Sequence, residues 1–207
     1  MSVTINASTS SGLVQTADTS GTVEIQSNGT TKLTVASTGV TANNLSATGT
    51  FGGGVITRAT AVASTSGTSI DFTSIPSWVA RITVMFSGVS VSGTSNTLVQ
   101  LGTSGGIVSS GYNSSAANQG GTTVSSTAGF LINSQTAASD TFSGIAVFTN
   151  ITSTNWVYAG TGKRTTNALA YGGGDGAIGG VVTQLRITTV NGTDTFDLGS
   201  INILYEG

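Results

Sequence analysis

The alternating run Arg81-Ile82-Thr83-Val84-Met85-Phe86 decides the fold class, and it lies inside a longer strand-like segment from Val79 to Val91. Along an extended backbone, Ile82, Val84 and Phe86 fall on one side and the residues between them fall on the other. This period-two pattern is typical of a strand with one buried face. The segment therefore predicts a long β-strand that packs one face against a core.

Shorter strand-like runs follow at residues 97–101, 129–132, 145–150 and 155–159. Glycine, serine and threonine separate these runs, and no long stretch has the 3.6-residue apolar period of a helix. Short strands between frequent turn residues are typical of sandwiches and jelly rolls. The sequence predicts an all-β chain whose main part is an antiparallel, jelly-roll-like β-sandwich.

The composition excludes several kinds of chemistry. The chain has no histidine and no cysteine, so it cannot form a Ser-His or Cys-His nucleophile pair or a conventional zinc site. Its 8 acidic residues show no spacing that singles out a pair of catalytic carboxylates. We therefore expect no enzymatic activity, no catalytic residues, no cofactor and no bound metal.

Charge and hydropathy restrict the classes of partner. A net charge of −2 provides no basic stripe for a phosphate backbone. No apolar run approaches the roughly 18 residues of a membrane span, and the first residues lack the basic start and apolar centre of a signal peptide. We expect neither nucleic-acid binding nor membrane insertion.

Aromatic residues are distributed unevenly, because every Trp, Tyr and Phe lies after residue 50. Fifty residues with only small apolar side chains cannot bury much core by themselves. The glycine-rich segment 48–54 therefore marks a boundary between an N-terminal attachment or trimerisation segment, residues 1–50, and a head domain, residues 51–207. The residues expected to take part in N-terminal assembly are Val14, Val23, Ile25, Leu33 and Val35.

A β-hairpin is predicted around Asn28-Gly29 in the N-terminal segment. A two-residue loop at this position would pair Ile25 with Lys32 and mix apolar and charged side chains on one face. A three-residue loop with a left-handed Gly29 keeps the two faces separate. The predicted pairs are therefore Val23 with Leu33 and Glu24 with Lys32.

A second hairpin is predicted at the C-terminus, where a two-residue type I′ turn at Asn191-Gly192 joins residues 184–190 to residues 193–198. The predicted cross-strand pairs are Ile187 with Phe196, Leu185 with Leu198, and Arg186 with Asp197. Beyond Gly199 the alternation changes phase, which predicts a β-bulge at this glycine.

Two polar segments are candidates for contact with a receptor. The uncharged run 112–121 has a tyrosine and amides that suit sugar rings and hydroxyls, and the alternative is a solvated loop over an oligomer surface. The glycine-rich run 171–176 is expected to be an exposed flexible loop, and the basic pair Lys163-Arg164 a solvated loop tip. The candidate receptor contacts are Tyr112, Asn113, Asn118, Gln119, Tyr171 and Asp175.

Two runs resemble segments of bacteriophage virion structural proteins, in particular tail-fibre proteins of phages that infect aquatic bacteria. The first is LVQTADTSGTVEIQSNGTTKLTV at residues 13–35, and the second is IDFTSIPSWVARITVMF at residues 70–86. Together with their surroundings they cover about two thirds of the chain. The resemblance is specific for a phage virion protein and carries no catalytic residues with it.

The resemblance implies a homotrimer with a β-rich head and an N-terminal segment that joins phage tail or capsid proteins. The expected function is a structural component of the virion, a short tail fibre whose head contacts the host surface, where carbohydrate is the expected ligand. A capsid decoration or cement protein is the alternative, and a polysaccharide depolymerase is a more distant third.

Overall fold

The computed structural model describes residues 21–37, 39–42, 56–152, 154–165 and 168–207. All regular elements in these residues are β-strands in antiparallel sheets, which confirms the predicted all-β class. The same residues include no helix long and apolar enough to cross a membrane. The chain divides into two compact units, Met1–Gly52 and Gly53–Gly207, and the division falls inside the glycine-rich segment 48–54.

The described part of the N-terminal unit is a three-stranded sheet in the order β1-β2-β3, formed by Val23–Ser27, Thr30–Ala36 and Gly39–Ala42. A two-residue turn joins β1 to β2. Asn28 and Gly29 both have positive φ, 53° and 72°, as a type I′ turn requires. The predicted three-residue loop is therefore wrong.

A β-bulge explains why the shorter turn is compatible with a uniform apolar face. The register shifts between Ile25 and Gln26, so that Gln26 pairs with Thr31 and Ile25 pairs with Leu33. Lys32 is the extra residue of the bulge, and the phase change keeps it from facing Ile25. In place of the predicted pairs, Val23 lies opposite Val35 and Glu24 lies opposite Thr34.

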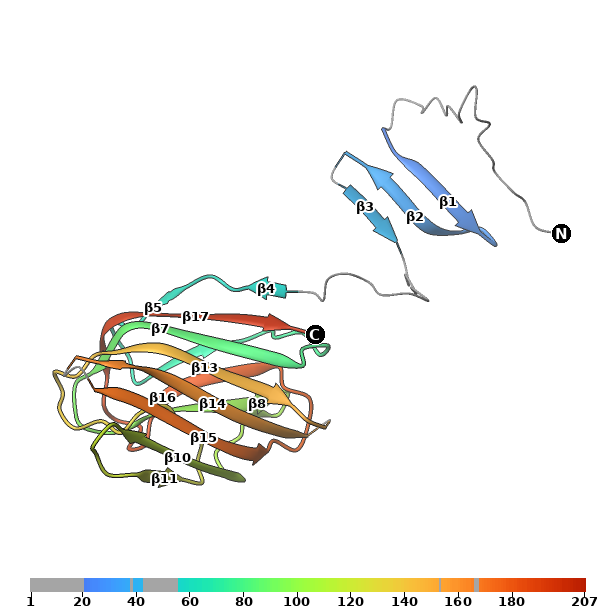
Figure 1. Ribbon diagram of the computed structural model, residues 1–207. Helices are drawn as coiled ribbons and strands as arrows, with labels where there is room; N and C mark the ends of the chain where they lie inside the picture. The colour runs from blue at the N-terminus through green and yellow to red at the C-terminus, as the bar shows by residue number, and fades with distance from the viewer. Residues whose placement is uncertain (1–20, 38, 43–55, 153, 166–167) are drawn as a thin grey trace. The chain divides into compact units, whose positions relative to one another are not determined.

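The second unit is a sandwich of two antiparallel sheets that face each other across one core (Figure 1). The large sheet has nine strands in the order β11-β10-β15-β14-β13-β7-β17-β4, with β5 also paired to β17. The small sheet has five strands in the order β12-β8-β16-β6, with β9 also paired to β8. This arrangement confirms the predicted antiparallel sandwich.

The strands of the head are short except in the middle of the large sheet. The bounds are β4 Ile56–Arg58, β5 Val62–Ala63, β6 Ser69–Phe72, β7 Arg81–Val91, β8 Thr97–Thr103, β9 Gly106–Ile107, β10 Tyr112–Asn118, β11 Val124–Ser126, β12 Phe130–Leu131, β13 Phe142–Asn150, β14 Asn155–Arg164, β15 Leu169–Ala177, β16 Gln184–Thr189 and β17 Phe196–Glu206.

The core lies between the sheets, and both sheets contribute side chains to it. On β7, Ile82, Val84 and Phe86 are buried as predicted from their alternation. Phe130 is fully buried, and its ring lies 4.9–5.4 Å from those of Tyr112, Phe148 and Tyr158. Because the core takes apolar side chains from strands of both facing sheets, period-two alternation is the pattern that forms it.

The predicted C-terminal hairpin is wrong, because β16 and β17 lie in different sheets. β16 pairs with β6 and β8, and β17 pairs with β7. Ile187 therefore lies opposite Ile70 and Val99 instead of Phe196. Arg186 lies opposite Asp71 and Gln100 instead of Asp197. Leu185 lies opposite Phe72 and Leu101 instead of Leu198.

The turn chemistry gives the physical reason. A type I′ turn needs positive φ at both central residues, but at Asn191-Gly192 only Gly192 has it, at 68°. Asn191 Oδ1 instead accepts hydrogen bonds from the backbone N–H groups of Thr193 and Asp194. This Asx-type geometry carries the chain from one sheet to the other, so that Ile187 and Phe196 face the same core from opposite sides.

The predicted bulge at Gly199 is confirmed. The register of β17 against β7 shifts on both sides of Leu198, and Gly199 has φ 94°. A Cβ atom at Gly199 would lie 2.5 Å from the carbonyl oxygen of Gly88. Both the left-handed backbone and the close approach of β7 therefore require glycine at this position.

Candidate functional site

The glycine-rich run 171–176 is part of strand β15 and not the flexible loop that was predicted. Its even-numbered glycines face the interior, where a Cβ at Gly172 would lie 2.7 Å from the Leu131 carbonyl oxygen. A Cβ at Gly176 would lie 2.9 Å from the ring of Tyr112. Glycine is needed because strand β12 and a buried aromatic ring pass directly beneath β15.

The odd-numbered residues of β15 face outward, beside the outward residues of β10. The ladder places Asn113 opposite Asp175, Ser115 opposite Gly173, and Ala117 opposite Tyr171. Asn113 Nδ2 donates a hydrogen bond of 3.4 Å to Asp175 Oδ1. The run predicted as a loop at 112–121 is therefore a strand up to Asn118, and it brings candidate residues from two distant segments onto one surface.

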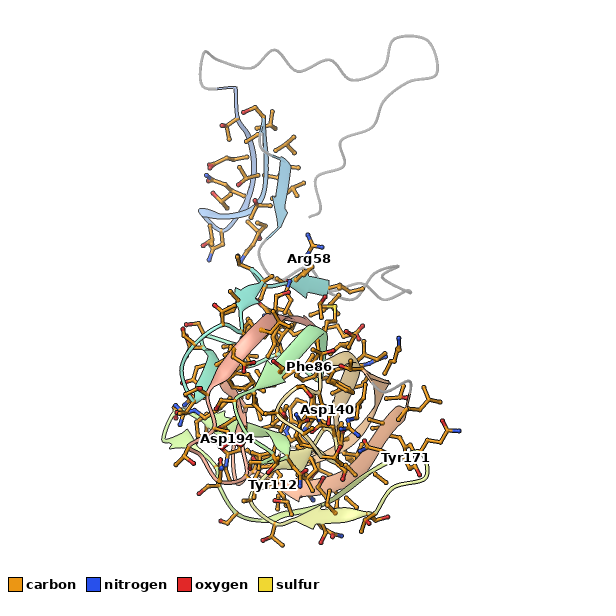
Figure 2. All side chains as sticks on the ribbon, turned by 90° about the vertical axis from the view of Figure 1, so that its left-hand side faces the viewer. Arg58, Phe86, Tyr112, Asp140, Tyr171 and Asp194 are labelled. Atoms are coloured by element: carbon orange, nitrogen blue, oxygen red, sulfur yellow. The ribbon has the colours of Figure 1, made fainter. Side chains whose placement is uncertain are left out.

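A shallow groove of about 290 Å³ runs along this surface. Its lining is mostly apolar and comes from Ser115, Ala117, Thr123, Tyr171 and Gly173, among others. The Tyr171 side chain is 53% exposed and lies at the surface of the sandwich (Figure 2). We call Asn113, Ser115, Thr123, Tyr171 and Asp175, with the glycines of β15 between them, the β10–β15 surface.

The six predicted receptor contacts separate into two groups. Asn113, Tyr171 and Asp175 lie on the β10–β15 surface, and Gln119 is exposed in the turn that follows β10. Tyr112 and Asn118 are 3% exposed and face the interior (Figure 2 labels Tyr112). Because neither buried side chain reaches the surface, both are structural residues of the head.

Tyr112 anchors β10 to β8 across the core. Its hydroxyl accepts a hydrogen bond from the Leu101 N–H at 2.9 Å and lies 3.0 Å from the Val108 carbonyl oxygen. Asn118 Nδ2 donates to the Ser134 carbonyl oxygen. Strand alternation places Tyr112 and Asn118 on the inner face of β10, and this alternation is the signal that distinguishes the run from a loop.

The two buried tyrosines give a matched test of hydroxyl bonding in the core. The Tyr158 hydroxyl has no hydrogen-bond partner, whereas the Tyr112 hydroxyl is bonded. We expect Tyr112→Phe to lower the free energy of unfolding by about 1–3 kcal/mol and Tyr158→Phe to leave it unchanged or raise it slightly. Urea unfolding followed by circular dichroism measures both. Equal losses in the two variants would contradict the assigned hydrogen bonds.

The chemistry of the β10–β15 surface suits an uncharged polar ligand with an apolar face. An exposed aromatic ring offers a flat surface for stacking. The Asn113 amide and the Asp175 carboxylate supply donors and acceptors, with the Ser115 and Thr123 hydroxyls close to the groove. Ser115 and Thr123 were not predicted as site residues from the sequence. Ser115 follows Asn113 by two residues, so strand alternation would place both on the same face.

The described carboxylates of the head are engaged in local structure. Asp71 pairs with Arg186, Glu206 with Arg81, and Asp140 with Arg164. Asp197 accepts a hydrogen bond from Ser90 Oγ, and Asp194 accepts one from the Ser95 N–H at 2.9 Å. Within the residues that the structure describes, no group of three or more acidic, histidine or cysteine side chains could hold a metal ion.

The predicted assembly residues lie on one face of the N-terminal sheet. Val23 and Ile25 of β1 lie opposite Val35 and Leu33 of β2, so the four side chains share a face. None of them is buried, and Ile25 is 53% exposed. Val14, the fifth candidate, lies outside the described residues. The N-terminal sheet therefore has an apolar face that its own described strands leave uncovered.

Comparison with known proteins identifies no relative: no family model matches the chain, no curated protein matches its sequence, and no solved structure matches its fold.

Proposed function

We propose that this chain is a structural component of a bacteriophage particle, a short homotrimeric tail fibre whose head contacts carbohydrate on the host surface. The observation that carries the host-contact part is the exposed Tyr171 ring at the apolar groove, with Ser115 and Thr123 in the same lining. The hydrogen-bonded Asn113 and Asp175 side chains lie about 13 Å farther along the same face. An apolar groove with a few polar groups in its lining is the usual form of a small-ligand site.

The anchoring part of the proposal concerns the N-terminal unit. Its apolar face, formed by Val23, Ile25, Leu33 and Val35, offers a surface to other chains of the fibre or to a tail protein. A three-stranded sheet of small apolar residues has little core of its own, and a partner would supply the missing burial. The resemblance of residues 13–35 to phage virion proteins favours the same role.

Removing the aromatic ring tests the host-contact site. We expect Tyr171→Ala to weaken binding of the purified protein to host cells, or to the matching saccharide on a glycan array, by about tenfold, which corresponds to about 1.4 kcal/mol. The matched control is Leu169→Ala, because Leu169 is 54% exposed and precedes Tyr171 by two residues on the same strand face. An equal loss in both variants, or none in Tyr171→Ala, would contradict the site.

The position of the protein on the particle tests the structural role. Gold-labelled antibody against the head is expected at the tail, at one vertex of intact particles. Labelling over the whole shell would replace the tail-fibre proposal with the capsid decoration protein. Release of reducing sugar from host capsule by the purified protein would instead favour the depolymerase.

A further inference from the structure

The outward face of the large sheet is unusual because it is nearly free of charge across its middle. Strands β17, β7, β13, β14, β15 and β10 run side by side across it (Figure 1). We call the outward side chains of the four strands β17, β7, β13 and β14 the central face. The β10–β15 surface continues it at one side.

The strand registers align these side chains in rows across the sheet. One row runs Leu204, Thr83, Val147 and Ala159, and the next runs Asn202, Met85, Ile145 and Thr161. Neither row contains a charged residue. Ile145 is 47% exposed, and Val147, Met85 and Leu204 are partly exposed beside it, so contiguous apolar side chains meet solvent in a single copy.

Charges lie only at the ends of the central face. At one end Arg81 and Glu206 form an ion pair, with 3.1 Å between Arg81 Nε and Glu206 Oε1. At the other end lie Lys163 and Asp197, which have opposite charges, and Arg58 of β4 adjoins the face beside Leu204. The paired charges neutralise each other, so two copies of this face would bring little like charge together. An uncharged centre with polar residues at the rim is also the usual composition of a protein–protein interface.

The outward face of the small sheet provides an internal comparison. It carries the Arg186–Asp71 pair, in which Arg186 Nε and Nη2 each donate to one oxygen of Asp71 at 2.7 Å. That hydrogen bond raises the pKa of Arg186 above its ordinary value. Gln100, Gln184 and Thr188 donate to backbone carbonyl oxygens beside it. The outward face of the small sheet thus carries polar side chains that are already hydrogen-bonded, whereas the central face carries exposed apolar side chains.

We infer that a second copy of this chain covers the central face. Its four strands at about 4.8 Å spacing and the nine paired residues of β13 and β14 at about 3.3 Å rise span roughly 19 Å by 30 Å, or roughly 570 Å². Standard protein–protein interfaces bury about 600–1,000 Å² on each partner, so the central face by itself approaches the lower end of that range and leaves the β10–β15 surface free for a ligand.

Sheet edges offer a weaker alternative for self-association. The strands at the two ends of the large sheet, β4 and β11, have only three residues each, so they present few free backbone groups for edge pairing. Contact through the face buries the apolar side chains that the edges lack. The inference rests on the self-association in the proposed function and assigns it a surface on the head, which leaves the β10–β15 surface free for a ligand.

A charge placed in the centre of the face tests the inference. Ile145→Lys adds a charge that a monomer leaves in water but that an interface would have to bury. Ala159→Arg is a second variant in the adjacent row, next to Val147. The matched control is Val190→Lys, because Val190 is a branched, 52% exposed residue that follows β16 in the small sheet. Light scattering coupled to size-exclusion chromatography of the full chain measures the mass.

The wild type and Val190→Lys are expected to have a mass of at least twice 20.4 kDa, and Ile145→Lys and Ala159→Arg a lower mass than the wild type. Circular dichroism of each variant should retain the wild-type β spectrum. A monomeric wild type would overturn both the inference and the proposed homotrimer, whereas folded Ile145→Lys and Ala159→Arg variants with the wild-type mass would overturn the inference alone. If an Ile145→Lys variant of lower mass still binds host cells, loss of self-association and loss of the Tyr171 binding site are separate effects.

Discussion

Asp140→Asn is expected to lower the free energy of unfolding of the head by about 3–5 kcal/mol, because it leaves the Arg164 guanidinium buried without a counter-ion. Both side chains are 4% exposed, and Arg164 Nη2 forms an ion pair with Asp140 Oδ2 (Figure 2 labels Asp140). Burial lowers the pKa of Arg164, since the interior disfavours its charge. Asp140 is the group that compensates this cost.

The pair belongs to a larger polar network that ties a loop to strand β14. Asp140 Oδ2 also accepts hydrogen bonds from the Ala137 N–H at 2.9 Å and from Thr136 Oγ1 at 3.0 Å. Arg164 Nη2 donates to Thr136 Oγ1 at 2.7 Å. Removing one charge therefore disturbs the loop that precedes β13 as well as the end of β14.

A double-mutant cycle measures how much of this effect belongs to the pair. Arg164→Met is expected to cost a similar amount, while Asp140→Asn combined with Arg164→Met should cost much less than the sum, because no buried charge remains. Urea unfolding followed by the fluorescence of buried Trp156 measures each variant. A loss below about 1 kcal/mol in both single variants, or an additive double variant, would contradict this account.

Phe130→Ala is expected to cost about 3–5 kcal/mol, because it removes the ring at the centre of the aromatic cluster and leaves a cavity. Phe130 is fully buried, lies edge-on to Tyr112, and is tilted against Phe148 and Tyr158. A head of this size loses roughly 10 °C of melting temperature for such a change. Differential scanning calorimetry provides the measurement.

Phe130→Leu is the matched control for this position. It keeps an apolar side chain of moderate volume, so the expected loss is less than half that of Phe130→Ala. The difference between the two variants reports the volume of the aromatic ring. If Phe130→Ala and Phe130→Leu were equally stable, the cluster would not have the packed centre that the ring distances indicate.

Alternation along individual strands was the part of the fold that the sequence predicted well. Ile82, Val84 and Phe86 are buried on one face of β7, and Gly199 marks a bulge. These features depend on the backbone period and on one residue's conformational range. Both are local properties, so a single sequence contains them.

Strand partners were predicted poorly because pairing is decided at a distance. The two Asn-Gly dipeptides have the same local chemistry, yet only Asn28-Gly29 adopts the type I′ turn. At Asn191-Gly192 the chain crosses to the second sheet, because Leu185 and Ile187 pack into the core opposite Phe196 instead of beside it. Either outcome satisfies the same alternating pattern.

The candidate site shows the same division. Tyr171, Asp175 and Asn113 were selected from their residue types, and the structure places them on one surface through the β10–β15 register. Tyr112 and Asn118 were selected for the same reason but are buried, and the Lys163-Arg164 pair predicted at a loop tip has Arg164 inside the head. The residue type determines what a side chain can bind, whereas the strand face on which it lies determines whether a ligand can reach it.

The sequence by itself determined that the chain is all-β, that its aromatic core follows residue 50, and that histidine and cysteine chemistry is absent. The tertiary structure alone decided which strands share a sheet, which glycines make room for neighbouring strands, and which charges are buried. The physical reason is that strand alternation depends only on residues that are neighbours in the sequence. Pairing, close packing and desolvation depend instead on residues far apart in the chain, such as Asp140 and Arg164 or Asn113 and Asp175.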